Sequence, residues 1–426
     1  MPHSPETTLR VIHSVDHFLN ISENWIYPQI TRVPGVESAV LCQNVTNLEH
    51  FPLDSSRIHV SPPPTGKWGG LARFLYRLGR LAGWWDLAAA LELRTWRPNI
   101  VHAHFGPRGC IGVSFKRWVG ASALVTSFYG ADAWMLPKVH PVFLKSYATL
   151  FSAGDLFLVE GAAMRERLRE LGCPVEKIRI HHIGVDLPSL PFAERAFSGE
   201  LKVIMIARFC EKKGFPPGLE ACARARARGM NLKVTIVGGA RPGDAAGEKI
   251  AERLRALAAT PALAGHVDFA GFLPPDRMRA TLQSHDVFLC PSQHASDGDA
   301  EGGSPVVLTE AMACGLVCIG TRHCDIPEVI RDGGTGYLAA EGDVESLADA
   351  LCQLKDNAEG LHALVQAGRR HIEESFALDK QAVGLQAIYS ELTSRLRAPA
   401  AQLATDSAAV VKHPIAKPGR RAAKPS

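Results

Sequence analysis

Short apolar runs alternate with amphipathic stretches along almost the whole chain. Runs rich in Val, Ile and Leu are typical of buried parallel strands, and the stretches between them have helical spacing. This alternation predicts an α/β protein with parallel sheets that are covered by helices. We expect strands at Leu9–Ser14, Ala39–Cys42, Ile100–Ala103, Leu124–Ser127, Leu156–Val159 and Ile178–His182, and then at 201–207, Lys233–Val237, Val267–Phe269, Val287–Cys290 and Val317–Gly320.

A stretch with the composition of a linker, 184–199, separates the two sets of strands. It divides the chain into a first domain over 1–190 and a second domain over 200–375. The segment 398–426 is rich in Ala, Pro, Lys and Arg and has no periodicity, so we expect it to be a disordered tail.

Composition agrees with two folded domains. A chain of 426 residues is longer than one hydrophobic core usually supports, and its 46% apolar and 21% charged residues are ordinary for a globular protein. The net charge of +4 equals the surplus of Lys and Arg over Asp in the tail, which leaves the folded body close to neutral. Charge therefore gives little support to nucleic-acid binding.

The ten cysteines show neither a CxxC pair nor a Cys/His spacing typical of zinc sites. We expect reduced thiols in a cytoplasmic protein without a metal site. The N-terminus lacks the pattern of a signal peptide, and no apolar run approaches the roughly 20 residues that span a bilayer.

The second half contains a long polar, glycine-bearing loop between an expected strand and an expected helix. Ser304 would be the N-cap of this helix, Pro305 its first residue and Gly315 its C-terminal stop. The backbone N–H groups behind Gly302 and Gly303, with the positive end of the helix dipole, would form a site for a phosphate.

Two glutamates flank this helix start in the segment 286–320. Glu301 precedes the helix and Glu310 lies inside it, where both could accept hydrogen bonds from sugar or ribose hydroxyls. From spacing alone, a capped helix with two exposed carboxylates is the simpler interpretation.

A cationic loop, RFCEKKGF, follows the strand expected at 201–207 and carries Arg208 and Lys213. Ligands in parallel α/β folds bind at such carboxyl ends. Two cations there could neutralise a diphosphate and stabilise the charge that grows on it as a group departs. Either residue alone is usually solvated, but a cationic loop together with an anion-binding helix start in one domain favours a diphosphate site.

The glycines of VTIVGGARPGD (234–244) do not form a dinucleotide fingerprint. Gly238, Gly239 and Gly243 do not spell GxGxxG, and no acidic residue about twenty positions later ends a following strand. A nicotinamide cofactor is therefore not expected.

These segments resemble the retaining glycosyltransferases of family 4, which have the GT-B fold of two facing Rossmann-like domains. RFCEKKGF is similar to the family's Arg-x4-Lys-Gly donor loop, and AEGGSPVVLTEAMACG to its paired-glutamate motif. DIPEVIRDGGTGYLA (325–339) resembles the signature that follows, and KIRIHHIGVDL (177–187) the segment before the linker. SVDHFLNISENWIYPQI (14–30) resembles a Ser-Glu-x-x-Ile motif of a branch that builds bacterial exopolysaccharide, capsule or lipopolysaccharide.

The resemblance implies a retaining enzyme, without metal or cofactor, that moves a sugar from a nucleoside-diphosphate donor to a saccharide or lipid-linked saccharide. Arg208 and Lys213 would bind the diphosphate, Glu310 the ribose and Glu301 the transferred sugar. A helix over 376–397 would cross back to the first domain, as in relatives. Further donor contacts, including a base pocket near 271–274, are expected at Gly238, Phe272, Gly302, Gly303, Ser304, Pro305 and Val306.

The chain departs from the family pattern at two places. Eight residues separate Glu301 from Glu310, where seven are usual. Tyr129 in SFYGADAW stands where the family often has a His before Gly, and tyrosine does not act as a base near neutral pH. Either Tyr129 keeps only a positioning role, or the chemistry depends on Asp132 or on His104, which could instead satisfy a buried carbonyl.

Basic residues and tryptophans lie together in 67–98. Such a helix suits either peripheral contact with an anionic membrane or packing against the core. A lipid-linked acceptor in the resembled branch favours the membrane.

Two other function classes remain compatible with the motifs. A nucleotide-sugar epimerase or hydrolase of the same fold would release nucleotide without an acceptor alcohol. A nucleotide-sugar-binding protein without catalysis would bind the donor but show no turnover, and the two departures above are its motivation.

Overall fold

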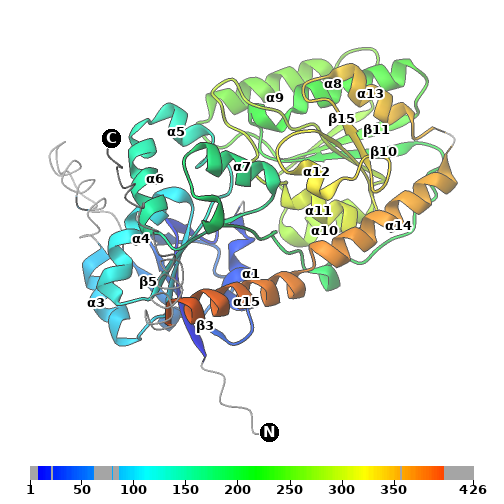
Figure 1. Ribbon diagram of the computed structural model, residues 1–426. Coiled ribbons are helices and arrows are strands. Elements are labelled where there is room, and N and C mark those ends of the chain that lie inside the picture. Colours follow the sequence, from blue (N-terminus) through cyan, green and yellow to red (C-terminus); the bar gives the residue numbers. More distant parts are fainter. Residues whose placement is uncertain (1–7, 21–22, 62–78, 80–85, 356, 398–426) are drawn as a thin grey trace, which may run out of the picture.

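The computed structural model describes residues 8–20, 23–61, 79, 86–355 and 357–397, which form two parallel sheets, each covered by helices (Figure 1). The predicted α/β class is therefore confirmed. In Figure 1 the first sheet lies on the left in blue to green, and the second on the right in green to orange.

The first sheet has seven strands in the order β5-β3-β1-β6-β7-β8-β9. Its strands are β1 (Leu9–Ser14), β3 (Val36–Cys42), β5 (Ile58–Val60), β6 (Ile100–His104), β7 (Ala123–Ser127), β8 (Leu156–Val159) and β9 (Ile178–Ile180). A small pair, β2 (His17–Phe18) and β4 (Asn44–Val45), lies beside it. The helices of this half are α1 (Ile26–Thr31), α3 (Leu87–Thr95), α4 (Gly106–Val119), α5 (Met135–Val139), α6 (Val142–Ala153) and α7 (Ala162–Glu170).

The second sheet has six strands in the order β12-β11-β10-β13-β14-β15. Its strands are β10 (Leu201–Ile206), β11 (Leu232–Val237), β12 (Val267–Gly271), β13 (Val287–Cys290), β14 (Val317–Thr321) and β15 (Tyr337–Ala339). The helices are α8 (Phe215–Ala227), α9 (Ala245–Ala258), α10 (Pro275–Gln283), α11 (Val306–Ala313), α12 (Ile326–Val329), α13 (Val344–Cys352) and α14 (Ala358–Ser375).

The central strands are continuous apolar runs because helices cover both of their faces. Every residue of β6, β7, β13 and β14 is buried, as expected for parallel strands. Such runs are the clearest strand signal in a sequence, which explains why these four were located to within one residue.

The last helix, α15 (Leu378–Arg397), packs on the first half of the molecule although it follows α14 of the second half. Leu385, Tyr389 and Leu392 share a buried cluster with residues of β1, β7 and β8. The Tyr389 hydroxyl lies 2.6 Å from Nδ1 of the buried His102 on β6. This helix ties the end of the second half to the first sheet.

Several local expectations were wrong. Helix α11 begins at Val306 and has Pro305 as its N-cap, without a side-chain capping bond, so Ser304 is not the N-cap. The reason is that Pro305 has extended backbone (φ −57°, ψ 126°), which delays the first helical turn. Strand β9 ends at Ile180 rather than at His182, and the short edge strands β5 and β15 were not predicted.

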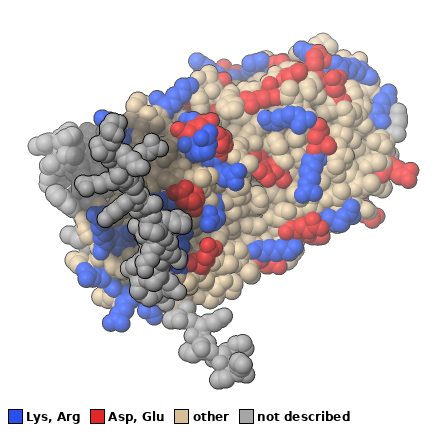
Figure 2. Space-filling model, in the orientation of Figure 1, with Lys and Arg blue, Asp and Glu red and all other residues tan. Residues whose placement is uncertain are grey.

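None of the ten cysteines is paired. Lys and Arg intermingle with Asp and Glu over the second half in Figure 2, without one continuous basic surface on this face. Within the described ranges no helix is long and apolar enough to cross a membrane. Most of the predicted membrane-facing segment 67–98 and the whole predicted tail 398–426 lie outside the described residues.

We predict that Tyr389→Phe lowers the free energy of unfolding by about 1–3 kcal/mol, because the buried His102 Nδ1 loses its partner. Urea denaturation, compared with a Tyr337→Phe control on β15, measures the effect. Equal denaturation midpoints for Tyr389→Phe and the wild type would contradict this role for the hydroxyl.

Candidate functional site

The two sheets meet where ligands bind in open α/β folds. Strand order reverses between β1 and β6 in the first sheet and between β10 and β13 in the second, and the loops at such points form binding crevices. Gly130 (φ 136°), after β7, lies against the backbone of Glu301 and Gly302 (φ 84°), after β13. A Cβ on either glycine would overlap the backbone opposite, so both glycines permit this contact between the halves.

An ion pair joins two of the predicted site residues at this meeting point. Nζ of Lys213 lies 2.7 Å from Oε2 of Glu301, and the two side chains are 18% and 6% exposed. Oε1 of the same carboxylate accepts a hydrogen bond from Oγ of Ser292 at 2.7 Å. With Pro305, these residues line a small cavity between β10, β13 and the start of α11.

Burial disfavours the charged form of both side chains, but the attraction between the two charges outweighs this effect. Burial lowers the pKa of Lys213, but the Glu301 carboxylate raises it by more, so it stands above its usual value. Burial raises the pKa of Glu301, but the Lys213 and Lys212 ammonium groups outweigh burial and leave it below its usual value. Both groups are therefore charged at neutral pH. Lys212 itself is paired with Asp299 at 3.0 Å.

Gly303 lies against a carboxylate that sequence analysis missed. A Cβ on Gly303 would overlap the carboxylate of Glu160, which follows β8 in the first half. Burial, and then repulsion from Asp325 and Glu301, raise the pKa of Glu160 well above its usual value. Ser304 and Val306 line a second small cavity together with Glu160. The predicted phosphate site thus opens towards the first half.

The other predicted donor residues lie in the loops after β10, β11 and β12 and in α11. Arg208, in the loop after β10, is half-buried; burial raises the pKa of Glu23 in the first half, and the charge of Arg208 offsets a small part of this rise. Glu310 lies inside α11, and burial raises its pKa to about 7. Gly238 (φ 115°) has no room for a Cβ against Ala207, and the 62% exposed Phe272 contacts the neighbouring Gly239.

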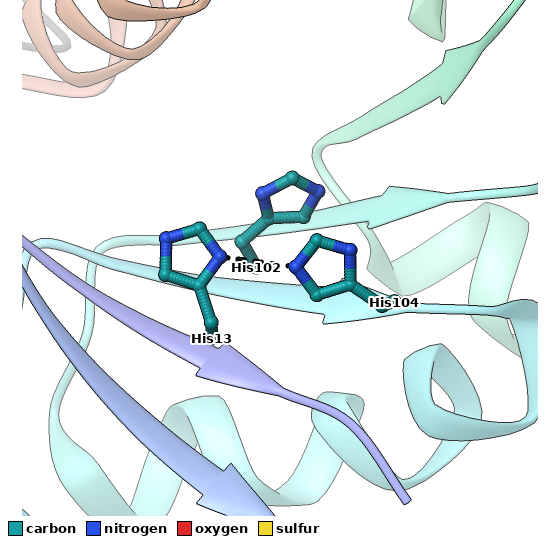
Figure 3. Close-up of side chains that lie close together, drawn as sticks. All are labelled: His13, His102 and His104. Atoms are coloured by element: carbon teal, nitrogen blue, oxygen red, sulfur yellow. Dashed lines mark hydrogen bonds between the residues drawn. The ribbon is translucent and has the colours of Figure 1, made fainter. Parts of the chain in front are cut away.

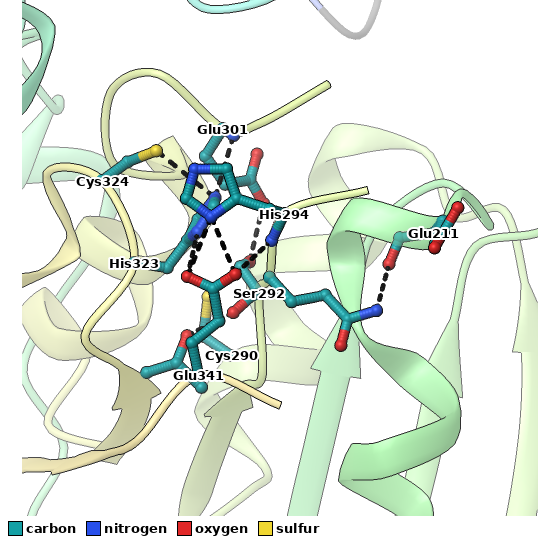
Figure 4. A network of polar contacts seen from close by, with 10 residues as sticks. Glu211, Cys290, Ser292, His294, Glu301, His323, Cys324 and Glu341 are labelled. Carbon is teal, nitrogen blue, oxygen red and sulfur yellow. Dashed lines mark hydrogen bonds and ion pairs between the residues drawn. The ribbon is translucent and has the colours of Figure 1, made fainter. Parts of the chain in front are cut away.

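A second set of missed residues holds the Glu301 loop (Figure 4). The backbone N–H of Glu301 donates to Nε2 of His323 at 3.1 Å, and Nδ1 of His323 lies 2.9 Å from Glu341. Ser292, His323 and Glu341 each follow the end of a strand, β13, β14 and β15 respectively. Their position at the carboxyl edge of the sheet is the signal that could have identified them.

Three buried histidines, His13, His102 and His104, lie close together on the central strands β1 and β6 of the first sheet (Figure 3). The Tyr129 hydroxyl lies 2.7 Å from Nδ1 of His104, and Nε2 of His104 lies 3.0 Å from Nδ1 of His13. The nitrogens of His102 contact Tyr389 and Ser127. His104 is fully buried, so it reaches the cleft only through Tyr129.

Two groups of residues could in principle hold a metal ion, because their ligand atoms lie within 4.8 Å of one another: His13 with His102 and His104, and His294 with His323 and Cys324. Burial lowers the pKa of all three imidazoles of the first group well below the usual value, so they are neutral. Five of the six ring nitrogens in this group are hydrogen bonded to one another or to hydroxyls, whereas the buried Nε2 of His13 has no partner among the described residues.

Asp132 organises the loop after β7. Its carboxylate accepts hydrogen bonds from the backbone N–H groups of Gly106, Tyr129 and Gly130 at 2.9, 3.1 and 2.9 Å. Oδ1 thus fixes Tyr129 and Gly130 in place, Oδ2 holds Gly106 at the start of α4, and the side chain is buried.

Carboxylates of the second half cap a helix of the first half. Asp325 accepts from the N–H of Ala163 at 2.7 Å and Glu328 from that of Ala162 at 3.1 Å, both in the first turn of α7. Negative charge is favoured at a helix N-terminus. Burial, followed by repulsion from Glu328, nevertheless raises the pKa of Asp325 to about 7.

Two family models together match most of the chain. The model of glycosyl transferases group 1 matches residues 188–371, and the model of the glycosyl transferase 4-like domain matches residues 31–184. The chain is 33% identical over 305 residues, 71% of each protein, to the "Putative colanic acid biosynthesis glycosyltransferase WcaL" of Escherichia coli K12. It is 32% identical over 291 residues to the amylovoran biosynthesis glycosyltransferase AmsK of Erwinia amylovora, covering 67% of this chain and 69% of AmsK.

Solved structures with this fold are also glycosyltransferases. HepE of Anabaena, solved in complex with UDP and glucose, superposes with a TM-score of 0.70 at 16% identity and covers 90% of this chain and 100% of its own. The lipopolysaccharide outer core galactosyltransferase WaaB, in its apo form, superposes with a TM-score of 0.65 at 15% identity, over 90% of this chain and 100% of its own. At this identity the likeness establishes the fold, which is the GT-B fold expected from the motifs.

The Asp325 contact generates a prediction about pH. Because the pKa of Asp325 is raised from 3.8 to about 7 in the folded protein, its stabilisation is fully present below about pH 4 and is lost as the pH rises through 7. Asp325→Asn keeps an acceptor for Ala163 but cannot ionise. We expect its free energy of unfolding to fall less than that of the wild type between pH 5 and pH 8, by about 2.5 kcal/mol, because part of the full shift lies below pH 5.

Chemical denaturation at the two pH values measures this difference. Asp268→Asn, at an exposed ion pair with Lys233 on the edge of the second sheet, is the matched control. An Asp325→Asn variant with the same pH dependence as the wild type would contradict the raised pKa.

Proposed function

The chain belongs to the group 1 glycosyl transferases of the GT-B fold, and we propose that it is a retaining, metal-independent hexosyltransferase. Its donor would be a nucleoside-diphosphate sugar, and its acceptor a hydroxyl of a saccharide or lipid-linked saccharide. Relatives named for colanic acid and amylovoran biosynthesis support a role in the assembly of a bacterial exopolysaccharide.

The single observation that carries this proposal is the buried Lys213–Glu301 pair in the cavity at the end of β10 and β13. One partner is a cation suited to a diphosphate, and the other is a carboxylate suited to sugar hydroxyls. Because the two are 2.7 Å apart, they favour a ligand that carries both kinds of group on adjacent atoms. A nucleoside-diphosphate sugar is such a ligand.

The surrounding residues support the same ligand. Arg208 adds a second cation, and the backbone of Gly302–Ser304 before α11 offers N–H groups to a phosphate. Glu310 would take the ribose, and Gly238 with the exposed Phe272 would accommodate the base. The complex of HepE with UDP and glucose supports a donor of this class.

The proposed chemistry breaks the bond between the anomeric carbon and the diphosphate and forms a bond to the acceptor oxygen on the same face of the sugar. The departing phosphate oxygen takes the acceptor proton. Negative charge grows on the diphosphate in this step, and Arg208 and Lys213 would stabilise it. Glu301 would hold the sugar in the reactive orientation.

The first half would present the acceptor and one wall of the donor site. Tyr129, whose hydroxyl is held by His104, would position the transferred sugar, and Asp132 would hold the Tyr129–Gly130 backbone. We propose 1–190 as the acceptor domain, 200–375 as the donor domain and 376–397 as the helix that connects them, in a cytoplasmic enzyme. Membrane contact through 67–98 and a disordered tail at 398–426 stay predictions.

Calorimetric titration with a panel of nucleoside-diphosphate sugars tests the proposal, first without metal and then with magnesium. Binding of one donor without metal, followed by transfer to an acceptor with retained anomeric configuration, is expected. Release of free sugar without an acceptor would indicate a hydrolase, and binding without any turnover would indicate a non-catalytic protein. Binding only with magnesium would exclude metal independence.

We predict that Lys213→Ala lowers kcat by about 100-fold or more, because the lost charge acts most strongly as the diphosphate leaves. Steady-state kinetics with the donor found by calorimetry measure the change. Lys233→Ala, which removes a half-exposed lysine of β11 that pairs with Asp268 on the edge strand β12, should leave kcat within about twofold. Near-normal kcat/KM in Lys213→Ala would overturn the assignment of this loop.

A further inference from the structure

The backbone of Glu301 is anchored from behind by a buried imidazole. The Glu301 N–H donates to Nε2 of His323 at 3.1 Å, and the His323 side chain is fully buried (Figure 4). His323 follows β14, whereas Glu301 belongs to the long loop after β13. The contact therefore fixes that loop to the neighbouring strand of the sheet.

This hydrogen bond determines the state of the imidazole. Because a backbone N–H can only donate, Nε2 of His323 must present its lone pair, and the ring proton must be on Nδ1. Nδ1 lies 2.9 Å from Oε2 of Glu341, which accepts that proton. Glu341 also accepts from the backbone N–H of His294. The result is a chain of two hydrogen bonds: the Glu301 N–H donates to the neutral His323 ring, and the ring donates to the Glu341 carboxylate.

The two sides of Glu301 are held by different groups. Ser292 and Lys213 hold the carboxylate, whereas His323 holds only the backbone. The next residue, Gly302, has a left-handed backbone (φ 84°) and lies against Gly130 of the first half. Without the His323 bond, the Glu301 side chain would keep its partners and Lys212 would still hold the Ala300 carbonyl at 2.9 Å, but the backbone of Glu301 itself would lose its anchor to the end of β14.

We propose that His323, oriented by Glu341, is a positioning residue that holds the Glu301 loop in the geometry required for sugar transfer. This inference rests on the proposed function, because it assigns to Glu301 the role of holding the transferred sugar. His323 does not line the cavities around Lys213 and Glu301 or around Glu160, so it acts through the loop and not by contact with substrate.

The arrangement works only with a neutral imidazole. Protonation would place a second N–H against the Glu301 N–H and break the anchor. The groups facing His323 are the carboxylates of Glu341 and Glu301, the imidazole of His294 and the thiol of Cys324. Burial lowers the pKa of His323 by more than the carboxylates raise it, which agrees with the neutral ring that the two hydrogen bonds require.

Two substitutions separate positioning from folding. His323→Ala removes the anchor, and we expect kcat to fall about 10- to 100-fold while KM for the donor changes less than about threefold, since Arg208 and Lys213 still bind the diphosphate. His323→Gln can accept from the Glu301 N–H and donate to Glu341, so we expect kcat within about fivefold of the wild type.

The control is His285→Ala. His285 is also buried and lies just before β13; its Nδ1 contacts the Thr281 carbonyl and its Nε2 contacts the Thr235 hydroxyl on β11. It does not line the cavity around Lys213 and Glu301. The control variant should leave kcat within about threefold. A loss as large as that of His323→Ala would show that removing any buried histidine of this domain has the same effect, and would overturn the positioning role.

Amide hydrogen exchange of the peptide containing 299–304 provides a readout that does not need activity. Faster exchange there in His323→Ala, but not in His323→Gln or His285→Ala, is expected. Unchanged exchange in His323→Ala would overturn the anchor even if activity fell, and a loosened loop with normal kcat would overturn its role in transfer. Absence of transfer by the wild-type protein would instead refute the proposed function, with the anchor still judged by exchange.

Discussion

The buried ion pair between Lys213 and Glu301 is the interaction on which the candidate site depends. Either charge alone would be expensive to bury, because an unpaired ion loses its hydration without compensation. The pair is tolerable only if the loop after β10 approaches the loop after β13 closely. Gly214 (φ 61°) provides that approach, since a Cβ there would overlap the carbonyl oxygen of Pro291. The ion pair, and any ligand binding by it, therefore requires that β10 and β13 be neighbours and that residue 214 be a glycine.

The same logic extends to the contact between the two halves. The loop that carries Glu301 meets the first half at positions without side chains: Gly302 lies against Gly130, and Gly303 lies against the Glu160 carboxylate. Asp132 stiffens one side of this contact by binding three backbone N–H groups, and His323 stiffens the other. Both loops are polar and irregular, so they would be mobile without such anchors. Rigid positioning of few reacting groups is what an electrostatic mechanism requires.

The sequence predicted the two-sheet fold and the ion-pair partners because both depend on local signals. Central strands such as β6 and β13 are continuous apolar runs, and Lys213 and Glu301 lie in motifs that resemble a known family. Ser292, His323 and Glu341 escaped prediction because their roles depend on contacts between loops that are far apart in the chain. No periodicity marks such residues, although all of them follow strand ends.

The observed start of α11 at Val306, later than the sequence predicted, bears on the unusual spacing of Glu301 and Glu310. The extra residue between Glu301 and Glu310 would rotate one carboxylate by about 100° if it were added inside a helix of 3.6 residues per turn. Pro305 instead keeps the chain extended until Val306, so the additional residue falls in the non-helical turn of Gly302–Pro305. Glu301 stays anchored to His323 at one end of this turn, and Glu310 keeps its place within α11 at the other. An additional residue in this non-helical turn does not rotate the side chains of α11. The departure from the family spacing therefore gives no reason to expect a site that has lost its activity.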